Sequence, residues 1–187
     1  MRTARAEWQA NQPTLDVLKL VFRDETGTSP KMTRARGRAP QGPRGSASVP
    51  HGHGHTTPFI AGLRVHAITA PMVLDGPLDG EAFLRYGQTF LCPTLQPGDI
   101  VMADNLPSHK VAGVQEAIAA TGARWRYLPP YSPDLNPIEN LFSKLQALLK
   151  KSAHRSRDAL WNAIGPLLGA FTATECVNYF KAAGYYA

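Results

Sequence analysis

The fold of this chain is decided by residues 100–105, Ile100-Val101-Met102-Ala103-Asp104-Asn105, an apolar run that ends in an acidic residue. Such a run predicts a strand that is buried on both faces of a sheet. The apolar spacing of residues 108–120 predicts a helix that stops at Gly122, and residues 124–128 predict a second strand. In this strand–helix–strand order the two strands are parallel and the crossover is right-handed. We therefore expect an α/β fold with parallel strands at its centre.

Further strands and helices are predicted on both sides of this unit. Residues 16–22 have the apolar, branched character of a strand, and residues 56–68 predict one or two strands bent at Gly62. Residues 27–54 are rich in Gly, Pro, Ser and Arg, and a hairpin is possible near residues 36–38 and 46–49. Helices are predicted over residues 1–8, 80–91, 137–151, 156–168 and 173–182.

The composition indicates one globular domain with a polyanionic partner. The chain has 187 residues, 43% of them apolar, which is enough to bury a core. Lys and Arg exceed Asp and Glu by 20 to 14, and the net charge of +6 favours nucleic acid. Cys92 and Cys176 match neither a disulfide framework nor a metal motif. The sequence contains neither a membrane-length apolar run nor a secretory signal, so we expect a reducing, cytoplasmic location.

Three acidic residues stand where a predicted buried element meets solvent. Asp24 ends an early apolar run, Asp104 ends the central one, and Glu139 opens the predicted helix over residues 137–151. Taken singly, each aspartate is also consistent with a turn or a helix cap. Ligands gather beyond the carboxyl ends of parallel strands, so the two aspartates meet if their strands are neighbours. Three such carboxylates can hold two divalent ions about 3.5–4 Å apart for phosphoryl transfer, which points to cutting or joining DNA.

Two interpretations of Glu139 remain open on spacing alone. Asn136 is a good N-cap, Pro137 suits the first helical position, and an acid three residues after the cap is typical of a capping box. However, Glu139 lies one step beside the apolar stripe of this helix. From there it can flank the sheet edge and act as a metal ligand while the stripe packs into the core.

Three segments of the chain carry a family resemblance: residues 24–27 (Asp-Glu-Thr-Gly), residues 102–110, and the proline-rich block of residues 128–139. They resemble the catalytic blocks of mariner-type insertion-sequence transposases. The 34 residues between Asp104 and Glu139 equal the spacing of that family, and the proline-rich block is its most specific feature. The resemblance extends from about residue 8 to residue 185. It implies a ribonuclease-H-like fold, in which helices flank a mixed five-stranded sheet.

The resemblance also implies chemistry and partners. Asp24, Asp104 and Glu139 become the catalytic residues and the ligands of two Mg²⁺ or Mn²⁺ ions, and the activity becomes DNA strand cleavage and strand transfer in transposition. The implied partners are transposon ends and target DNA, with a homodimer as the active complex in the bacterial nucleoid. Candidate groups on the DNA side are Asn105, His109, Lys110, Lys144, Lys150 and Lys151.

Several of these basic residues have a second interpretation. Lys144, Lys150 and Lys151, with Arg155 and Arg157, are equally consistent with a solvated helical face. The free N–H groups that follow Ser108 can hold a DNA phosphate, but Ser108 is also a simple N-cap. His51, His53 and His55 alternate with glycine, which would align three imidazoles for zinc or copper in a strand but is more typical of a loop.

Two departures from the family pattern, Arg23 and Pro107, lie close to the predicted acids. The Arg23 guanidinium is able to pair with Asp24 and to compete with a cation for its charge. An inactive or repurposed DNA-binding remnant is therefore an alternative, as is a host nuclease with a ribonuclease-H-like fold.

The expected domain organisation is a single catalytic domain over residues 1–187, with a short linker or helix over residues 1–15. Family members normally carry an N-terminal helix-turn-helix region that recognises the ends of the element. We accordingly expect a catalytic-domain fragment or the second of two reading frames, which binds DNA with little sequence preference.

Overall fold

The computed structural model describes residues 2–32, 56–105 and 113–186. Its strands are β1 (Leu20–Thr28), β2 (Thr57–Leu63), β3 (Ile68–Val73), β4 (Ile100–Ala103) and β5 (Arg124–Tyr127). Its α-helices are α1 (Arg2–Asn11), α2 (Gly80–Tyr86), α3 (Val114–Ala120), α4 (Ile138–Ser152), α5 (Arg157–Leu168) and α6 (Ala173–Ala182). Short helical turns are η1 (Gln12–Thr14), η2 (Val17–Lys19), η3 (Gly87–Leu91), η4 (Cys92–Thr94) and η6 (Pro133–Leu135).

The strands form one mixed five-stranded sheet in the order β3-β2-β1-β4-β5, as the resemblance implied. The strands β1, β4 and β5 are parallel, whereas β2 is antiparallel to both β1 and β3. The predicted unit of two parallel strands and a helix is therefore confirmed in β4, α3 and β5. The early strand lies beside the central one, because Leu20 to Phe22 pair with Ile100 to Met102.

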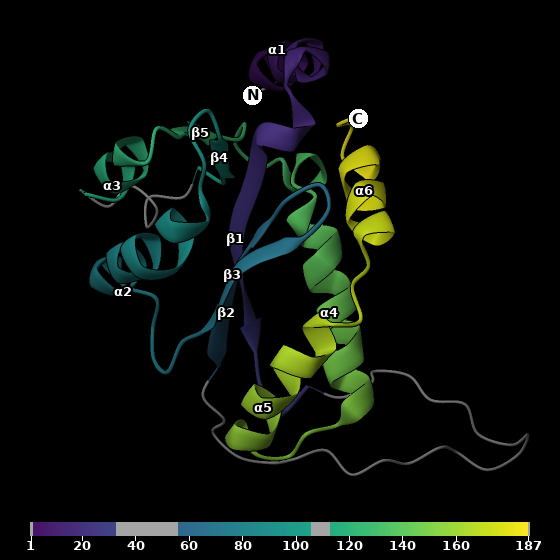
Figure 1. The fold of residues 1–187 in the computed structure, drawn as a ribbon. Helices are drawn as coiled ribbons and strands as arrows, with labels where there is room; N and C mark the ends of the chain where they lie inside the picture. The colour runs from purple at the N-terminus through teal and green to yellow at the C-terminus, as the bar shows by residue number, and fades with distance from the viewer. Residues whose placement is uncertain (1, 33–55, 106–112, 187) are drawn as a thin grey trace, which may run out of the picture.

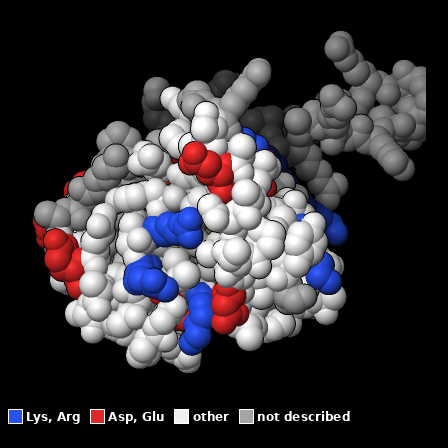
Figure 2. Space-filling model, turned by 90° about the horizontal axis from the view of Figure 1, so that it is seen from above, with Lys and Arg blue, Asp and Glu red and all other residues white. Residues whose placement is uncertain are grey.

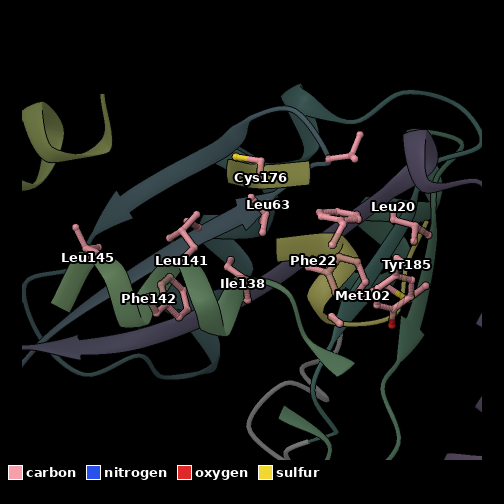
Figure 3. Close-up of a cluster of buried hydrophobic side chains, with 14 of the residues drawn as sticks. Leu20, Phe22, Leu63, Met102, Ile138, Leu141, Phe142, Leu145, Cys176 and Tyr185 are labelled. Carbon is pink, nitrogen blue, oxygen red and sulfur yellow. The ribbon is translucent and has the colours of Figure 1, made fainter. Parts of the chain in front are cut away.

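Helices cover both faces of the sheet, with α4, α5 and α6 on one side and α2 and α3 on the other (Figure 1). Successive residues of a strand point to opposite faces, so Leu20 and Phe22 belong to one core cluster and Val21 to the other. On the first face, side chains of α4, including Ile138 and Leu141, pack with Phe22 (Figure 3). No helix within the described ranges is long and apolar enough to cross a membrane.

The first strand differs from its prediction at both ends. Residues 17–19 form a helical turn because the Asp16 carboxylate accepts the backbone N–H of Leu18. The strand does not end near Asp24 but continues to Thr28, since β2 pairs with it from Phe22 onward. Its pairing with β4, however, stops at Phe22 and Met102. Asp24 thus lies just beyond the end of the parallel pairing, although it is inside a strand.

Other predicted boundaries shift for local reasons. The stretch of residues 56–68 becomes β2 and the start of β3, and the register between them shifts around Gly62. A Cβ at Gly62 would lie 2.7 Å from a methyl group of Thr69, so this close strand approach requires glycine. The helix predicted over residues 80–91 is α-helical to Tyr86 and continues as the wider turn η3. The possible hairpin near residues 36–38 and 46–49 lies outside the described residues.

The N-terminal helix is joined to the loop that precedes α4. Trp8 is buried, and its Nε1 donates to the hydroxyl of Tyr185 at 3.1 Å. The same hydroxyl donates to the backbone oxygen of Leu135 at 3.0 Å. Arg5 adds two hydrogen bonds, of 2.9 and 2.7 Å, to the carboxylate of Asp134. Both ends of the described chain therefore hold this loop.

We predict that Tyr185→Phe destabilises the fold by about 1–3 kcal/mol, because it leaves the buried Trp8 N–H and Leu135 carbonyl without their partner. Urea unfolding measures the loss. The matched control is Tyr186→Phe, since Tyr186 is 71% exposed whereas Tyr185 is 1% exposed. Equal stability of the two variants would show that the buried hydroxyl contributes nothing.

Candidate active site

A cavity of about 310 Å³ brings the three predicted acids together. Asp24 comes from β1, Asp104 directly follows β4, and Glu139 lies in the first turn of α4. The cavity opens where β4 leaves the sheet and β1 loses a neighbour. Its remaining lining residues are Asn105, Leu128, Pro129, Pro130, Tyr131, Ser132, Pro133 and Asn136.

Asp24 is the most buried of the three acids, at 8% exposure. Its Oδ1 accepts the backbone N–H of Glu25 at 2.8 Å, and its Oδ2 accepts Nδ2 of Asn136 at 2.7 Å. Burial first, and then the negative charge of Glu25, raise the pKa of Asp24 to about 7. The site therefore holds a carboxylate that is expensive to ionise at neutral pH without a cation.

Like charges also raise the pKa of Glu139. Its pKa lies above its ordinary value because of burial first, then because of the charges of Asp104 and Glu25. The charge of Asp104 also raises the pKa of Asp24. Sequence reasoning did not include Glu25 in this group, although it directly follows Asp24 in the first family block. A bound cation would relieve the repulsion among these acids.

The acids line one cavity, yet they do not surround a common point. Within the described ranges, no group of three or more His, Cys, Asp or Glu residues is placed to hold a metal ion. Both oxygens of Asp24 accept hydrogen bonds from neighbouring groups, which fixes its carboxylate where it lies. Carboxylate oxygens are nevertheless the ligands that Mg²⁺ and Mn²⁺ prefer. The donor chemistry fits such an ion, and closing the site requires side-chain movement.

The capping-box interpretation of Glu139 is wrong. The helix starts at Ile138 with Pro137 as its N-cap, and none of the described side chains caps it there. The Asn136 amide, which would have been the cap, instead donates to Asp24. A capping box does exist in α6, where Thr172 and Glu175 exchange their hydrogen bonds. Glu139 is therefore available to the cavity.

The hypothesis that Arg23 pairs with Asp24 is also wrong. Arg23 is fully buried, and its Nη1 lies 3.0 Å from a carboxylate oxygen of Glu25. Its guanidinium stacks 4.1 Å from the ring centroid of Phe83 in α2. Residues 23 and 25 share one face of β1 because strand side chains alternate, and Asp24 points to the other. Arg23 consequently does not occupy the cation position at Asp24.

The candidate DNA contacts lie in different parts of the molecule. Asn105 lines the cavity, whereas Pro107, Ser108, His109 and Lys110, like His51, His53 and His55, lie outside the described residues. The Lys144 ammonium pairs with Glu175 at 2.5 Å and donates to a backbone oxygen, so its charge is compensated within the protein. Lys150 and Lys151 are in the last turn of α4, about 16 Å along the helix from Glu139.

The described surface carries no single basic face in the view of Figure 2. Lys and Arg side chains lie there among Asp, Glu and uncharged residues. Any DNA-binding surface on this side of the described protein is therefore a set of separate contacts.

Tyr131 is a feature of the cavity rim that sequence reasoning missed. It is 85% exposed, which is rare for so large a ring, and its φ of 54° lies in the left-handed region. That backbone conformation costs about 1–2 kcal/mol for a residue other than glycine. The flanking Pro130 and Ser132-Pro133 indicate a turn in the sequence, but they do not show that the ring is exposed or that the backbone is left-handed. Strain of this kind is common at functional sites.

We predict that Asp24→Asn stabilises the metal-free fold at pH 8 but not at pH 4. In the unchanged protein, Asp24 loses its proton near pH 4 when the chain is unfolded and near pH 7 when it is folded. The folded state of the unchanged protein is therefore fully stable at low pH and loses stability as the pH rises from about 4 to about 7. The advantage of the variant should grow to about 4 kcal/mol at pH 8. Urea unfolding at several pH values measures it, with the exposed Asp158→Asn as control. An advantage independent of pH would contradict the raised pKa.

Comparisons with known proteins give the family of the chain and structures that share its fold. Residues 19–161 match the family model described as DDE superfamily endonuclease. The Mos1 transposase paired-end complex with left transposon end has a TM-score of 0.73 and 18% identity, covering 98% of this chain and 57% of that one. The Mos1 mariner paired end complex with Mn has a TM-score of 0.74 and 18% identity, covering 98% and 57%.

The catalytic domain of Mos1 mariner transposase has a TM-score of 0.68 and 15% identity, covering 98% of this chain and 85% of that one. This chain thus spans just over half the length of the longer Mos1 chains. No curated protein matches it in sequence. The likeness to Mos1 shows a shared fold, and the family match covers most of the chain. The chain belongs to the DDE superfamily endonuclease family.

Proposed function

We propose that residues 1–187 form the catalytic domain of a transposase, which cleaves and joins DNA strands during transposition of an insertion sequence. The observation that carries the proposal is the meeting of Asp24, Asp104 and Glu139 around one cavity, from three separate elements. Membership of the DDE superfamily endonuclease family supports it. The spacing of 34 residues between the last two acids supports the mariner-like branch.

The proposed cofactor is a pair of Mg²⁺ or Mn²⁺ ions held by these three carboxylates. Two observations support the fit: the donors are hard oxygens around one cavity, and burial, followed by the charges of nearby acids, raises the pKa of Asp24 and Glu139. One of the Mos1 complexes contains Mn, as its description states. Bound ions would activate water or a 3′-hydroxyl and stabilise the leaving oxygen, so a covalent protein intermediate is not required.

The protein's own residues fix the geometry of this site. Two hydrogen bonds hold the Asp24 carboxylate, and the backbone of α4 sets the position of Glu139. Leu128 and Pro129 are buried against the cavity and form an apolar wall. Such a wall limits solvent around the acids, which strengthens electrostatic interactions with a bound phosphate.

The proposed partner is DNA, in the form of transposon ends and target. The net charge of +6 favours a polyanion, and one Mos1 complex contains a transposon end, as its description states. We further propose a homodimer as the active complex in the nucleoid, because transposition of the kind that the resemblance implies brings two transposon ends together. Tyr131 suits a stacking contact with an unpaired base beside the acids, since its exposed ring is presented at the cavity rim.

Two alternatives differ from this proposal. The inactive-remnant hypothesis was motivated by the expected lack of an N-terminal DNA-binding region together with Arg23, and Arg23 pairs with Glu25 instead of Asp24. A host nuclease with the same fold differs from a transposase in one reaction, the joining of a 3′-hydroxyl to a target strand. Incubation of the chain, supplied with a matching end-binding region, with Mn²⁺, a pre-cleaved 3′ end and plasmid separates them. Hydrolysis without joined products would favour the nuclease and reject the transposase.

We predict that Glu139→Gln lowers Mn²⁺-dependent nicking of plasmid by about a hundredfold or more, because a neutral amide is a poor ligand for a hard cation. The fold should keep its stability, since Glu139 caps no helix. The matched control is Glu116→Gln, an exposed acid in the first turn of α3. If Glu139→Gln nicked plasmid at the same rate as the unchanged protein, Glu139 would not be a metal ligand of the site.

DNA binding should be weak, steeply salt-dependent and at most a few-fold selective, because phosphate contacts carry no sequence information. Fluorescence anisotropy with single-stranded oligonucleotides measures it. Replacing Lys150 and Lys151 with Ala should flatten the salt dependence, whereas Tyr131→Ala should lower affinity at every salt concentration without changing the slope. Tyr186→Ala, which removes another exposed ring, is the control. Tight, salt-tolerant selection of one sequence would overturn the proposal of nonspecific binding.

A further inference from the structure

Asn136 is the side chain that most directly holds the first acid of the site. Its Nδ2 donates to Oδ2 of Asp24 at 2.7 Å, across 112 residues of sequence. Asn136 is 3% exposed and lines the same cavity as the three acids. The contact is therefore a buried hydrogen bond to an ionisable ligand candidate, where an amide donor is worth more than on the surface.

The other half of the Asn136 amide has no such partner. Its Oδ1 is buried and accepts no hydrogen bond from any residue that the structure describes. A buried acceptor left in this state costs about 1–3 kcal/mol. The side chain does not cap α4 either, since the N-cap there is Pro137. Fold stability thus gives little reason for asparagine at this position, and its contact with Asp24 gives a functional one.

The backbone of Asn136 connects it to the third acid. Its carbonyl accepts the backbone N–H of Glu139 at 3.2 Å, and its own N–H donates to the carbonyl of Pro133 at 3.0 Å. One residue consequently binds Asp24 through its side chain and Glu139 through its main chain. Its position sets how far the first and third carboxylates lie from each other.

We propose that Asn136 is a positioning residue of the metal site, which orients the Asp24 carboxylate and sets its distance from Glu139. An amide donor suits this role because it brings no positive charge that would compete with a cation. Each Asp24 oxygen accepts one protein hydrogen bond and keeps a lone pair for an ion. Residues that hold metal ligands in this way typically change metal affinity by about 10–100-fold when they are replaced. The inference rests on the proposed function for the identity of the ion.

The chain offers a matched control two residues further along the same face of β1. Nε2 of Gln146 in α4 donates to the hydroxyl of Thr26 at 2.7 Å. Like the bond from Asn136 to Asp24, this bond joins an amide in or next to α4 to a side chain of β1 at 2.7 Å. Thr26, however, does not line the cavity. Replacing Gln146 therefore removes a similar hydrogen bond without affecting a carboxylate of the site.

The experiment is calorimetric titration of Mn²⁺ into the purified chain at pH 8, for the unchanged protein, Asn136→Ala and Gln146→Ala. Asn136→Ala should weaken Mn²⁺ binding about 10–100-fold, and Gln146→Ala less than about twofold. Nicking by Asn136→Ala should recover as Mn²⁺ is raised, which a merely structural defect would not show. Asn136→Ser, a smaller change, serves the same test if the alanine variant unfolds, and urea unfolding verifies the fold of each.

The outcomes separate this inference from the function beneath it. The positioning role alone is overturned if Asn136→Ala binds Mn²⁺ with the same affinity as the unchanged protein. It is also overturned if Gln146→Ala loses as much Mn²⁺ affinity as Asn136→Ala. Unchanged protein that binds no Mn²⁺ overturns the proposed metal site and, with it, the role of Asn136.

Discussion

The rest of the site depends on one constraint, the burial of the Asp24 carboxylate. Asp24 lies in β1 just past the point where β1 stops pairing with β4. Because β4 ends at Ala103, β1 has only β2 beside it from Arg23 onward, and the space that β4 vacates becomes the cavity. The proline-rich loop after β5 keeps that space open, since proline cannot extend a hydrogen-bonded ladder. A carboxylate in such a place is poorly solvated. The two hydrogen bonds to Asp24 offset part of that cost, and a cation would offset more.

The two faces of β1 separate two kinds of charge. On the face of α2, the buried Arg23 and the partly buried Glu25 form an ion pair against Phe83. On the face of α4, Asp24 lies among other acids. Proximity still couples the faces, because the charge of Glu25 raises the pKa of both Asp24 and Glu139 while that of Arg23 lowers the pKa of Asp24. An apolar residue in place of Arg23 would leave Glu25 without this partner and make the cavity more negative.

Local patterns in the sequence were sufficient for the central strands and helices. The apolar run before Asp104, the helix stop at Gly122 and the apolar stripe of α4 depend only on neighbours along the chain, and each prediction was confirmed within a few residues. What failed depended on distant partners. The continuation of β1 past Asp24 requires β2, and the loss of the expected cap requires the Asp24 carboxylate beside Asn136. Spacing does not contain that information.

The same limit applied to Tyr131, whose strained backbone persists only where its surroundings hold it. Within the described chain, those surroundings include both ends. Arg5 of α1 holds Asp134, and Tyr185 near the C-terminus holds Leu135, the residue next to Asn136. Residues near both ends of the described chain thus contact the loop between β5 and α4. This loop contains Tyr131 at the cavity rim and Asn136, whose amide binds Asp24. The geometry of the candidate site is therefore a property of the whole fold, because neither β1 nor α4 alone fixes the loop between β5 and α4.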